Sequence, residues 1–114
     1  MGEPATADQL IDGYTALIRA AHRRGVRVIG ATLTPTKGAA IPVYYKPDGE
    51  AVREAVDDWI RGSGAYDAVV DLDRVLADPT DPARLRPGYD SGDGVHPNDA
   101  GMLAIADAID LDTL

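Results

Sequence analysis

The chain has 114 residues, a formal net charge of −8 at pH 7 and a hydrophobic content of 45%. This length suits one domain, and the apolar content permits a packed core, which must be mostly aliphatic because there is no Phe and one Trp. The negative charge disfavours binding to nucleic acids and to anionic membrane surfaces. The absence of cysteine excludes disulfides, thiolate nucleophiles and cysteine-ligated zinc.

Neither a leader nor a membrane span is expected. The start of the sequence, Met1 to Pro4, has no basic region and no apolar run, so we expect no signal peptide. No apolar segment approaches the roughly 20 residues needed to cross a bilayer. The compartment in which the protein works stays open.

The first part of the chain predicts a helix followed by a strand. Thr6 and Gln9 form a capping-box pattern, apolar residues then recur at helical spacing, and Gly25 can end the helix. His22, near the end of this helix, is expected to be a solvated residue that favours the helix dipole. The β-branched run Val26–Leu33 predicts a buried strand.

A long loop and a second helix come next. Residues 34–49 contain three prolines and two glycines, which predicts a loop that carries Tyr44 and Tyr45. These tyrosines are candidates to line a pocket, although packing of the loop explains them equally well. Residues 50–61 have an apolar face at helical spacing that includes Trp59, which predicts a helix with Trp59 in the core.

The remainder of the chain predicts one more strand and one more helix. Residues 68–72 form a short strand, residues 73–76 a helical turn, and residues 78–87 a connection rich in Pro and Asp. The loop 88–97 then leads into a helix over residues 98–109. The residues of this helix that we expect to point inward are Met102, Ile105, Ala106 and Ile109.

The order helix, strand, helix, strand, helix places the chain in the α/β class. Its centre is a single βαβ unit, which implies parallel strands joined by a right-handed crossover. Two parallel strands make a very small sheet, because buried parallel strands pack with further strands and with helices on both faces. The pattern therefore indicates part of a larger domain.

Chemistry is concentrated in the loop before the last helix. Asp93 and His96 lie three residues apart in a segment bounded by Gly and Pro. A carboxylate at this spacing can accept a hydrogen bond from one imidazole nitrogen and stabilise the imidazolium, which leaves the other nitrogen free to take a proton from a nucleophile. Such loops lie at the carboxyl ends of the strands, where α/β folds place their active sites.

Two other interpretations of this loop remain open. A carboxylate and a histidine at this spacing often form a solvated or helix-capping cluster, and Asn98 or Asp99 is a reasonable N-cap for the last helix. A metal site with hard ligands is the other, although the spacing matches neither an EF-hand nor a zinc motif. The ligands of such a metal site would be Asp90, Asp93, His96 and Asp99. We nevertheless expect neither a metal nor a cofactor.

A longer comparison favours the catalytic interpretation. Residues 89–102, which read Tyr-Asp-Ser-Gly-Asp-Gly-Val-His-Pro-Asn-Asp-Ala-Gly-Met, resemble the final block of the SGNH (GDSL) hydrolases, a family of esterases and lipases. Residues 28–35 and 50–59 are also similar to the later part of those enzymes. The resemblance implies that residues 1–114 are the C-terminal portion of one domain with a three-layer flavodoxin-like fold. It also implies that Asp93 orients the ring and that His96 is the general base.

The chain departs from the family where the nucleophile should be. The Gly-Asp-Ser motif that carries the family's serine does not occur, and the only serines are Ser63 and Ser91. Ser63 reads as a turn residue, and Ser91 lies in the His loop without a strand-to-helix elbow. The family's oxyanion donors, a glycine block and the asparagine of Gly-x-Asn, have no counterpart, since the only asparagine is Asn98.

These departures limit what the chain is expected to do alone. Loss of a triad member leaves about 10³–10⁴-fold acceleration, which depends on an oxyanion hole and on substrate binding. We therefore expect part of a serine esterase whose intact domain cleaves carboxylic esters, for example of an acylated sugar or a lipid. The alternative is an inactive remnant or interaction module that pairs with itself or with another chain. A third possibility combines these two hypotheses: a separate partner chain binds this one and supplies the catalytic serine.

Overall fold

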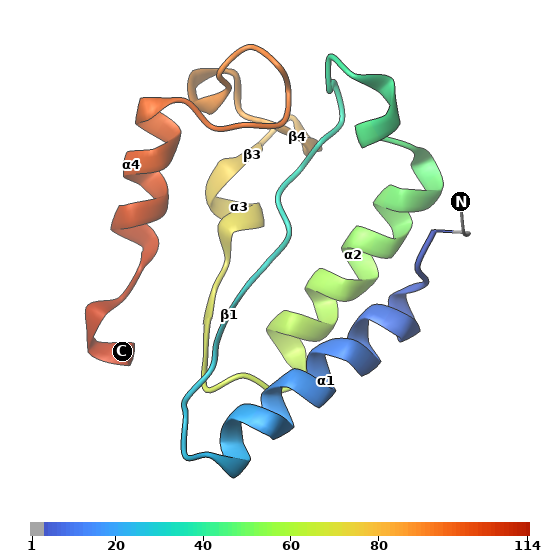
Figure 1. Ribbon diagram of the computed structural model, residues 1–114. Coiled ribbons are helices and arrows are strands. Elements are labelled where there is room, and N and C mark those ends of the chain that lie inside the picture. Colours follow the sequence, from blue (N-terminus) through green and yellow to red (C-terminus); the bar gives the residue numbers. More distant parts are fainter. Residues whose placement is uncertain (1–3) are drawn as a thin grey trace.

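The computed structural model describes residues 4–114 (Figure 1). Residues 1–3, on which most of the signal-peptide expectation rests, lie outside the described residues. The helices and strands are α1 (Ala7–Arg23), β1 (Ile29–Ala31), α2 (Pro47–Gly62), β2 (Ala68–Val70), α3 (Leu72–Leu76), β3 (Ala77–Asp78), β4 (Asp81–Leu85) and α4 (Asp99–Ala108). Short 3₁₀ turns cover Pro42–Tyr44, Pro87–Tyr89 and Leu111–Thr113.

The architecture is α/β, and it is consistent with part of a three-layer flavodoxin-like fold. β1 and β2 are parallel, with Ile29 opposite Ala68 and Ala31 opposite Val70, so the predicted βαβ unit is confirmed. In Figure 1, α1 and α2 lie on one side of these strands and α4 lies on the other. No helix within residues 4–114 has both the length and the apolar character needed to span a bilayer.

The first helix begins and ends as its sequence predicts. The Thr6 hydroxyl accepts a hydrogen bond from the Gln9 backbone N–H at 3.1 Å, and the Gln9 side chain accepts one from the Thr6 N–H at 2.9 Å. Each of these bonds satisfies an N–H group that a helix start leaves unpaired. At the other end, Gly25 has a φ of 73°, a left-handed conformation that glycine adopts without strain.

The strands are shorter and more exposed than predicted. Val26–Leu33 was expected to be one buried strand, but only Ile29–Ala31 pairs, and Val26 and Leu33 are 54% and 37% exposed. Within residues 4–114, β1 has a partner on one edge only, and the backbone hydrogen bonds to the β2 segment extend no further than the Val28 carbonyl and the Thr32 N–H. The second strand ends at Val70, because the Asp71 carboxylate caps α3 by accepting a bond from the Arg74 N–H.

Two other expectations need correction. Residues 78–87 are not a plain connection, since β3 and β4 form an antiparallel hairpin there. Pro82 hides it from sequence analysis, because proline is compatible only with an edge strand. Met102 and Ala106 of the last helix, and Ile109 just after it, are exposed rather than inward, and the buried residue is Gly101, which packs against Tyr89 and Pro97.

The apolar core is small. Its fully buried aliphatic residues come from four elements, α1, α2, α3 and β4, and they are Ile18, Val56, Ile60, Leu76 and Leu85. Trp59 is only partly buried and meets Tyr66 edge-on, with ring centroids 5.9 Å apart. Many large apolar side chains stay exposed, including those on α4, so the described residues leave apolar surface uncovered.

A buried ion cluster joins α2 to the end of β1. Asp57 is fully buried, and its carboxylate accepts a hydrogen bond from the Leu33 backbone N–H at 2.7 Å. The Arg53 guanidinium donates to the Leu33 carbonyl at 3.0 Å. Both backbone groups of Leu33 are therefore bound by side chains of a helix instead of by a neighbouring strand.

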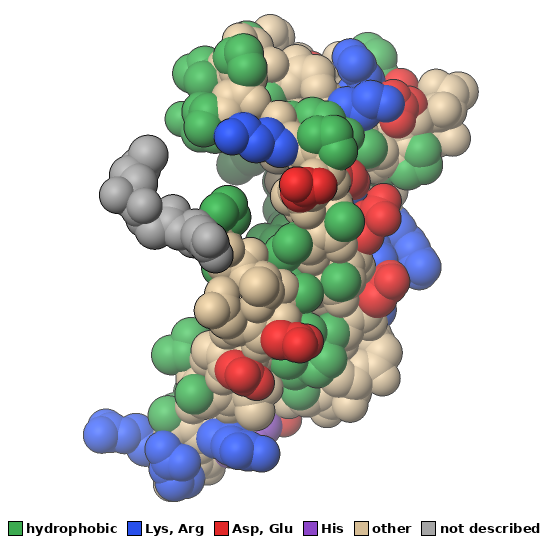
Figure 2. Space-filling view, turned by 90° about the vertical axis from the view of Figure 1, so that its right-hand side faces the viewer, with side chains coloured by type: hydrophobic (Ala, Val, Ile, Leu, Met, Phe, Trp, Pro, Cys, Tyr) green, Lys and Arg blue, Asp and Glu red, His purple; other side chains and the backbone are tan. Residues whose placement is uncertain are grey.

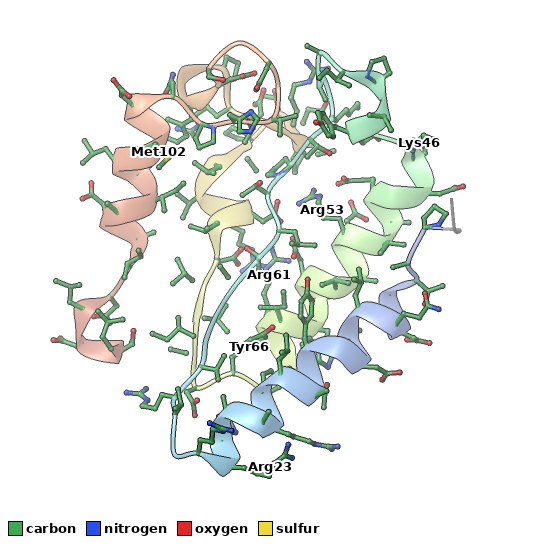
Figure 3. The ribbon with its side chains drawn as sticks, in the orientation of Figure 1. Arg23, Lys46, Arg53, Arg61, Tyr66 and Met102 are labelled. Carbon is green, nitrogen blue, oxygen red and sulfur yellow. The ribbon has the colours of Figure 1, made fainter. Side chains whose placement is uncertain are left out.

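The same cluster reaches the end of β2. Arg53 also donates to Asp73 at 2.6 Å, and Arg61 donates to Asp71 at 2.7 Å and to Asp73 at 2.6 Å. Both arginines point from α2 towards the strands (Figure 3). α2 thereby fixes the carboxyl ends of both parallel strands, which is the end of the sheet where the His loop lies.

Packing at Gly30 provides the first prediction. A Cβ added at Gly30 would lie 2.6 Å from the Tyr66 ring, so Gly30→Ala should lower the free energy of unfolding by about 1–3 kcal/mol. Gly13→Ala, in the open middle of α1, is the matched control and should raise it by up to about 1 kcal/mol. Urea unfolding measures both, and equal stability of the two variants would contradict the packing seen at Gly30.

Burial of Asp57 provides a prediction about pH. Burial raises the pKa of Asp57 to about 6, despite the opposing hydrogen bond from Leu33. Because folded Asp57 holds its proton more tightly than unfolded Asp57, its contribution to the free energy of unfolding falls by about 3 kcal/mol between about pH 4 and pH 7. Asp57→Asn should remove this contribution.

The measurement is urea unfolding at several pH values between 5 and 7. Asp58→Asn, an exposed neighbour on the same helix, is the control and should keep the wild-type slope. If the difference in stability between Asp57→Asn and the wild type did not change over this range, the raised pKa of Asp57 would be wrong.

Candidate active site

The His loop lies at the end of the sheet where the parallel strands finish, as expected (Figure 1). It is closed at its base by a bridge between Asp90 and Pro97, and the Ser91 N–H donates to the His96 carbonyl at 3.0 Å. Within the loop, one oxygen of Asp90 accepts the N–H groups of Gly92 and Gly94 at 2.8 and 3.0 Å. Both glycines have positive φ, which the tight turn requires.

Asp93 and His96 form a direct pair. The imidazole Nδ1 of His96 lies 2.5 Å from one carboxylate oxygen of Asp93. The other oxygen accepts the backbone N–H groups of Val95 and His96, both at 2.8 Å, and the Ser91 hydroxyl donates to it at 3.3 Å. The carboxylate is thus held by two residues of its own loop besides its histidine.

These bonds keep the Asp93 carboxyl ionised. The backbone N–H of His96, its imidazole and the backbone N–H of Val95, in that order, hold the pKa of Asp93 well below its usual range. An ionised carboxylate only accepts hydrogen bonds, so we assign the ring proton to Nδ1 of His96. The other ring nitrogen, Nε2, is then the basic one.

The basic nitrogen of His96 is accessible. The His96 side chain is 73% exposed, and within residues 4–114 its Nε2 makes no hydrogen bond. An oriented imidazole with a free, unprotonated nitrogen can accept a proton from a hydroxyl group that is brought to it.

The loop that contains Gly38 and Ala40 contacts the His loop and supports the Asp93–His96 pair. The Ala40 N–H donates to the Asp93 carbonyl at 2.8 Å, and the turn around Gly38 packs against Gly94 so closely that no side chain fits between them. Sequence analysis missed this support. The only available signal was the combination of glycines in two separate loops, which does not identify a contact.

Other predicted residues have structural roles. Asn98 is the N-cap of α4, accepting from the Gly101 N–H at 2.9 Å, and its amide donates to the carbonyls of Gly88 and Asp90. It therefore has no free donor for an oxyanion. Ser63 accepts the Ala65 N–H in a turn, while Ser91 donates to Asp93 and not to His96.

The metal interpretation gains no support from the geometry. Residues 4–114 contain no group of three or more His, Cys, Asp or Glu side chains arranged to hold a metal ion. One oxygen of Asp90 is occupied by two backbone N–H groups, and one oxygen of Asp93 by the imidazole. Asp99 lies in the first turn of α4.

The second histidine is not merely solvated. Nε2 of His22 lies 2.8 Å from the Asp67 carboxylate, which also accepts the Val28 N–H, so this pair joins the end of α1 to the starts of both strands. The pair lies at the opposite end of the sheet from His96 (Figure 1).

Tyr44 and Tyr45 line a groove of about 960 Å³ with Leu33 and Val52.

The contact between the two loops yields a prediction. A Cβ at Gly94 would overlap the Gly38 carbonyl, whereas a Cβ at Gly92 would meet nothing within 4 Å. Gly94→Ala should therefore displace the loop and weaken the Asp93–His96 bond. Gly92→Ala should cost only the strain of positive φ, about 1–2 kcal/mol. The readout is the downfield NMR signal of the His96 Nδ1 proton, and its survival in Gly94→Ala would contradict the proposed support.

Comparison with known proteins identifies the family of the chain. The model of the GDSL-like Lipase/Acylhydrolase family matches residues 1–104, and no curated protein matches the chain. The matched range includes both parallel strands and the whole Asp93–His96 loop. The chain belongs to the GDSL-like lipase/acylhydrolase family.

Proposed function

We propose that this chain supplies the general base and its orienting carboxylate to a serine hydrolase of carboxylic esters. The supporting observation is the short bond between His96 Nδ1 and Asp93, which leaves an exposed Nε2 on a fixed ring. Family membership supports the reaction class, since the family consists of lipases and acylhydrolases.

In this mechanism, Nε2 of His96 takes the proton from a serine hydroxyl as the oxygen attacks the ester carbonyl. His96 then donates the proton to the departing alkoxide, and it activates water in the same way when the acyl-enzyme is hydrolysed. Asp93 stays ionised throughout and stabilises the imidazolium that forms twice in each cycle.

The serine and the oxyanion donors must come from outside these 114 residues. Ser91 cannot act without leaving Asp93, and Ser63 lies in the turn after α2. The amide of Asn98 is used twice in the loop. We therefore propose that the chain is the C-terminal portion of a domain that a Gly-Asp-Ser segment completes.

The second candidate is an inactive interaction module. It is favoured by the unpaired edge of β1 and by exposed apolar side chains such as Leu103 and Leu111. The two candidates differ in one respect, which is whether His96 is required for the turnover of an ester.

The test uses nitrophenyl acetate and a fluorophosphonate, which labels activated serines. The chain alone should give neither a burst nor a labelled serine. Co-expressed with a polypeptide that carries the Gly-Asp-Ser and Gly-x-Asn blocks, it should give both. In that complex, His96→Ala should lower kcat by about 10⁶-fold and Asp93→Asn by about 10⁴-fold.

The chain provides its own matched control. His22 is its only other histidine and is also paired with an aspartate, so His22→Ala should leave kcat unchanged. If the completed enzyme turned over equally fast with His96→Ala, the proposal would fail. If a folded complex were inactive for every variant, the interaction module would be the better description.

A further inference from the structure

Charge is strongly segregated along this acidic chain. Residues 13–47 contain six Lys or Arg and no Asp or Glu, although the whole chain has 11 basic and 19 acidic residues. Residues 87–114 show the reverse, with six Asp and no Lys or Arg. The net charge of −8 therefore hides two segments of opposite sign.

Four of the basic residues form one surface at the end of α1. We call Arg19, Arg23, Arg24 and Arg27 the basic end; all four are exposed, and none of them makes an ion pair within residues 4–114. Figure 2 shows basic side chains gathered at the lower end of the molecule, and Figure 3 places Arg23 there. The Asp67 carboxylate, at the start of β2, is already bound by His22 and by the Val28 N–H.

Apolar side chains accompany these arginines. Leu17 and Val26 are both more than half exposed, on α1 and just after it. A helix end that carries only cations is explained by the helix dipole, but exposed apolar residues beside them are not.

A complementary surface follows α4. We call Asp107, Asp110 and Asp112 the acidic tail, and exposed Ile109, Leu111 and Leu114 lie among them. Asp107 stands in the last turn of α4, which holds no basic residue. A negative charge at the negative end of a helix is locally unfavourable, so Asp107 lacks a partner that its own helix would provide.

We propose that the basic end of one copy of this chain binds the acidic tail of a second copy, so that the protein forms a two-fold dimer. Both surfaces lie towards the same end of the molecule, away from the His loop (Figure 1). In a two-fold arrangement each copy presents both surfaces to the other, so the two contacts form together. Apolar residues next to the charges on each surface become buried in the contact.

This inference is independent of the proposed catalysis, because it uses no residue of the Asp93–His96 loop. It also predicts a dependence on salt. Charges on the surface are screened beyond about 10 Å at 0.1 M ionic strength, so dimerisation should weaken as salt is added.

The experiment measures oligomeric state by light scattering during size exclusion, at low and at high salt. The wild-type chain should be dimeric at low salt and shift to monomer in about 0.5 M NaCl, where the screening length is several ångströms. Arg23→Glu/Arg24→Glu should be monomeric, since the basic end then carries two Arg and two Glu and has no net positive charge. Asp107→Lys/Asp112→Lys should be monomeric because the acidic tail then has a net positive charge facing the basic end. Asp110 is left unchanged because its side chain accepts the Asp112 N–H.

Mixing these two double variants is the decisive step. In one contact the unchanged basic end meets the unchanged acidic tail, and in the other the introduced Glu side chains face the introduced Lys side chains, so a one-to-one heterodimer should form. The matched control is Arg74→Glu/Arg84→Glu, which changes two exposed arginines outside the basic end and should stay dimeric. Circular dichroism checks that every variant is folded. A wild type that is monomeric at every salt concentration, or a mixture that stays monomeric, would overturn the proposal.

Discussion

The structure depends on the two charged side chains of α2 that bind the backbone of Leu33. Among the residues that the structure describes, β1 pairs with β2 on one edge only, so the other edge must find partners elsewhere. At Leu33, Asp57 and Arg53 provide these partners by binding the backbone N–H and carbonyl. Arg53 and Arg61 also form hydrogen bonds with the aspartates that follow β2. The desolvation of Asp57 opposes folding at neutral pH, but removing one partner would leave a buried charge uncompensated. The cluster therefore fixes geometry more than it adds stability.

This arrangement gives the His loop a defined platform. From Leu33 the chain passes directly into the segment whose Ala40 N–H holds the Asp93 carbonyl. The cluster at Leu33, the chain from Leu33 to Ala40 and the Ala40–Asp93 hydrogen bond thus connect α2 to the loop of the candidate base. The rest of the loop is closed by its own residues, since Asp90, Asp93 and Asn98 all bind backbone groups within ten positions.

Features encoded locally were predictable from the sequence. The capping box at Thr6, the Asn98 N-cap and the Asp93–His96 spacing all depend on residues near each other in the chain, and the βαβ unit follows from the order of its elements. What was missed depends on distant contacts: the length of β1 is set by a partner on one edge only, and the supporting turn at Gly38 is 56 positions from Gly94. Helix periodicity also failed in α4, because exposure of Met102 is decided by which neighbours are present and not by the pattern itself.

The local closure of the His loop has a consequence for the order of assembly. Contacts of short sequence separation form early in folding, whereas the pairing of β1 with β2 must close a loop of nearly 40 residues. The hydrogen bonds inside the loop can thus form before the sheet is complete and before any serine is present, and the turn around Gly38 then fixes the loop in place. Under the proposed function, the timing of activity would then be controlled by when the nucleophile arrives, since the base and its carboxylate belong to one loop.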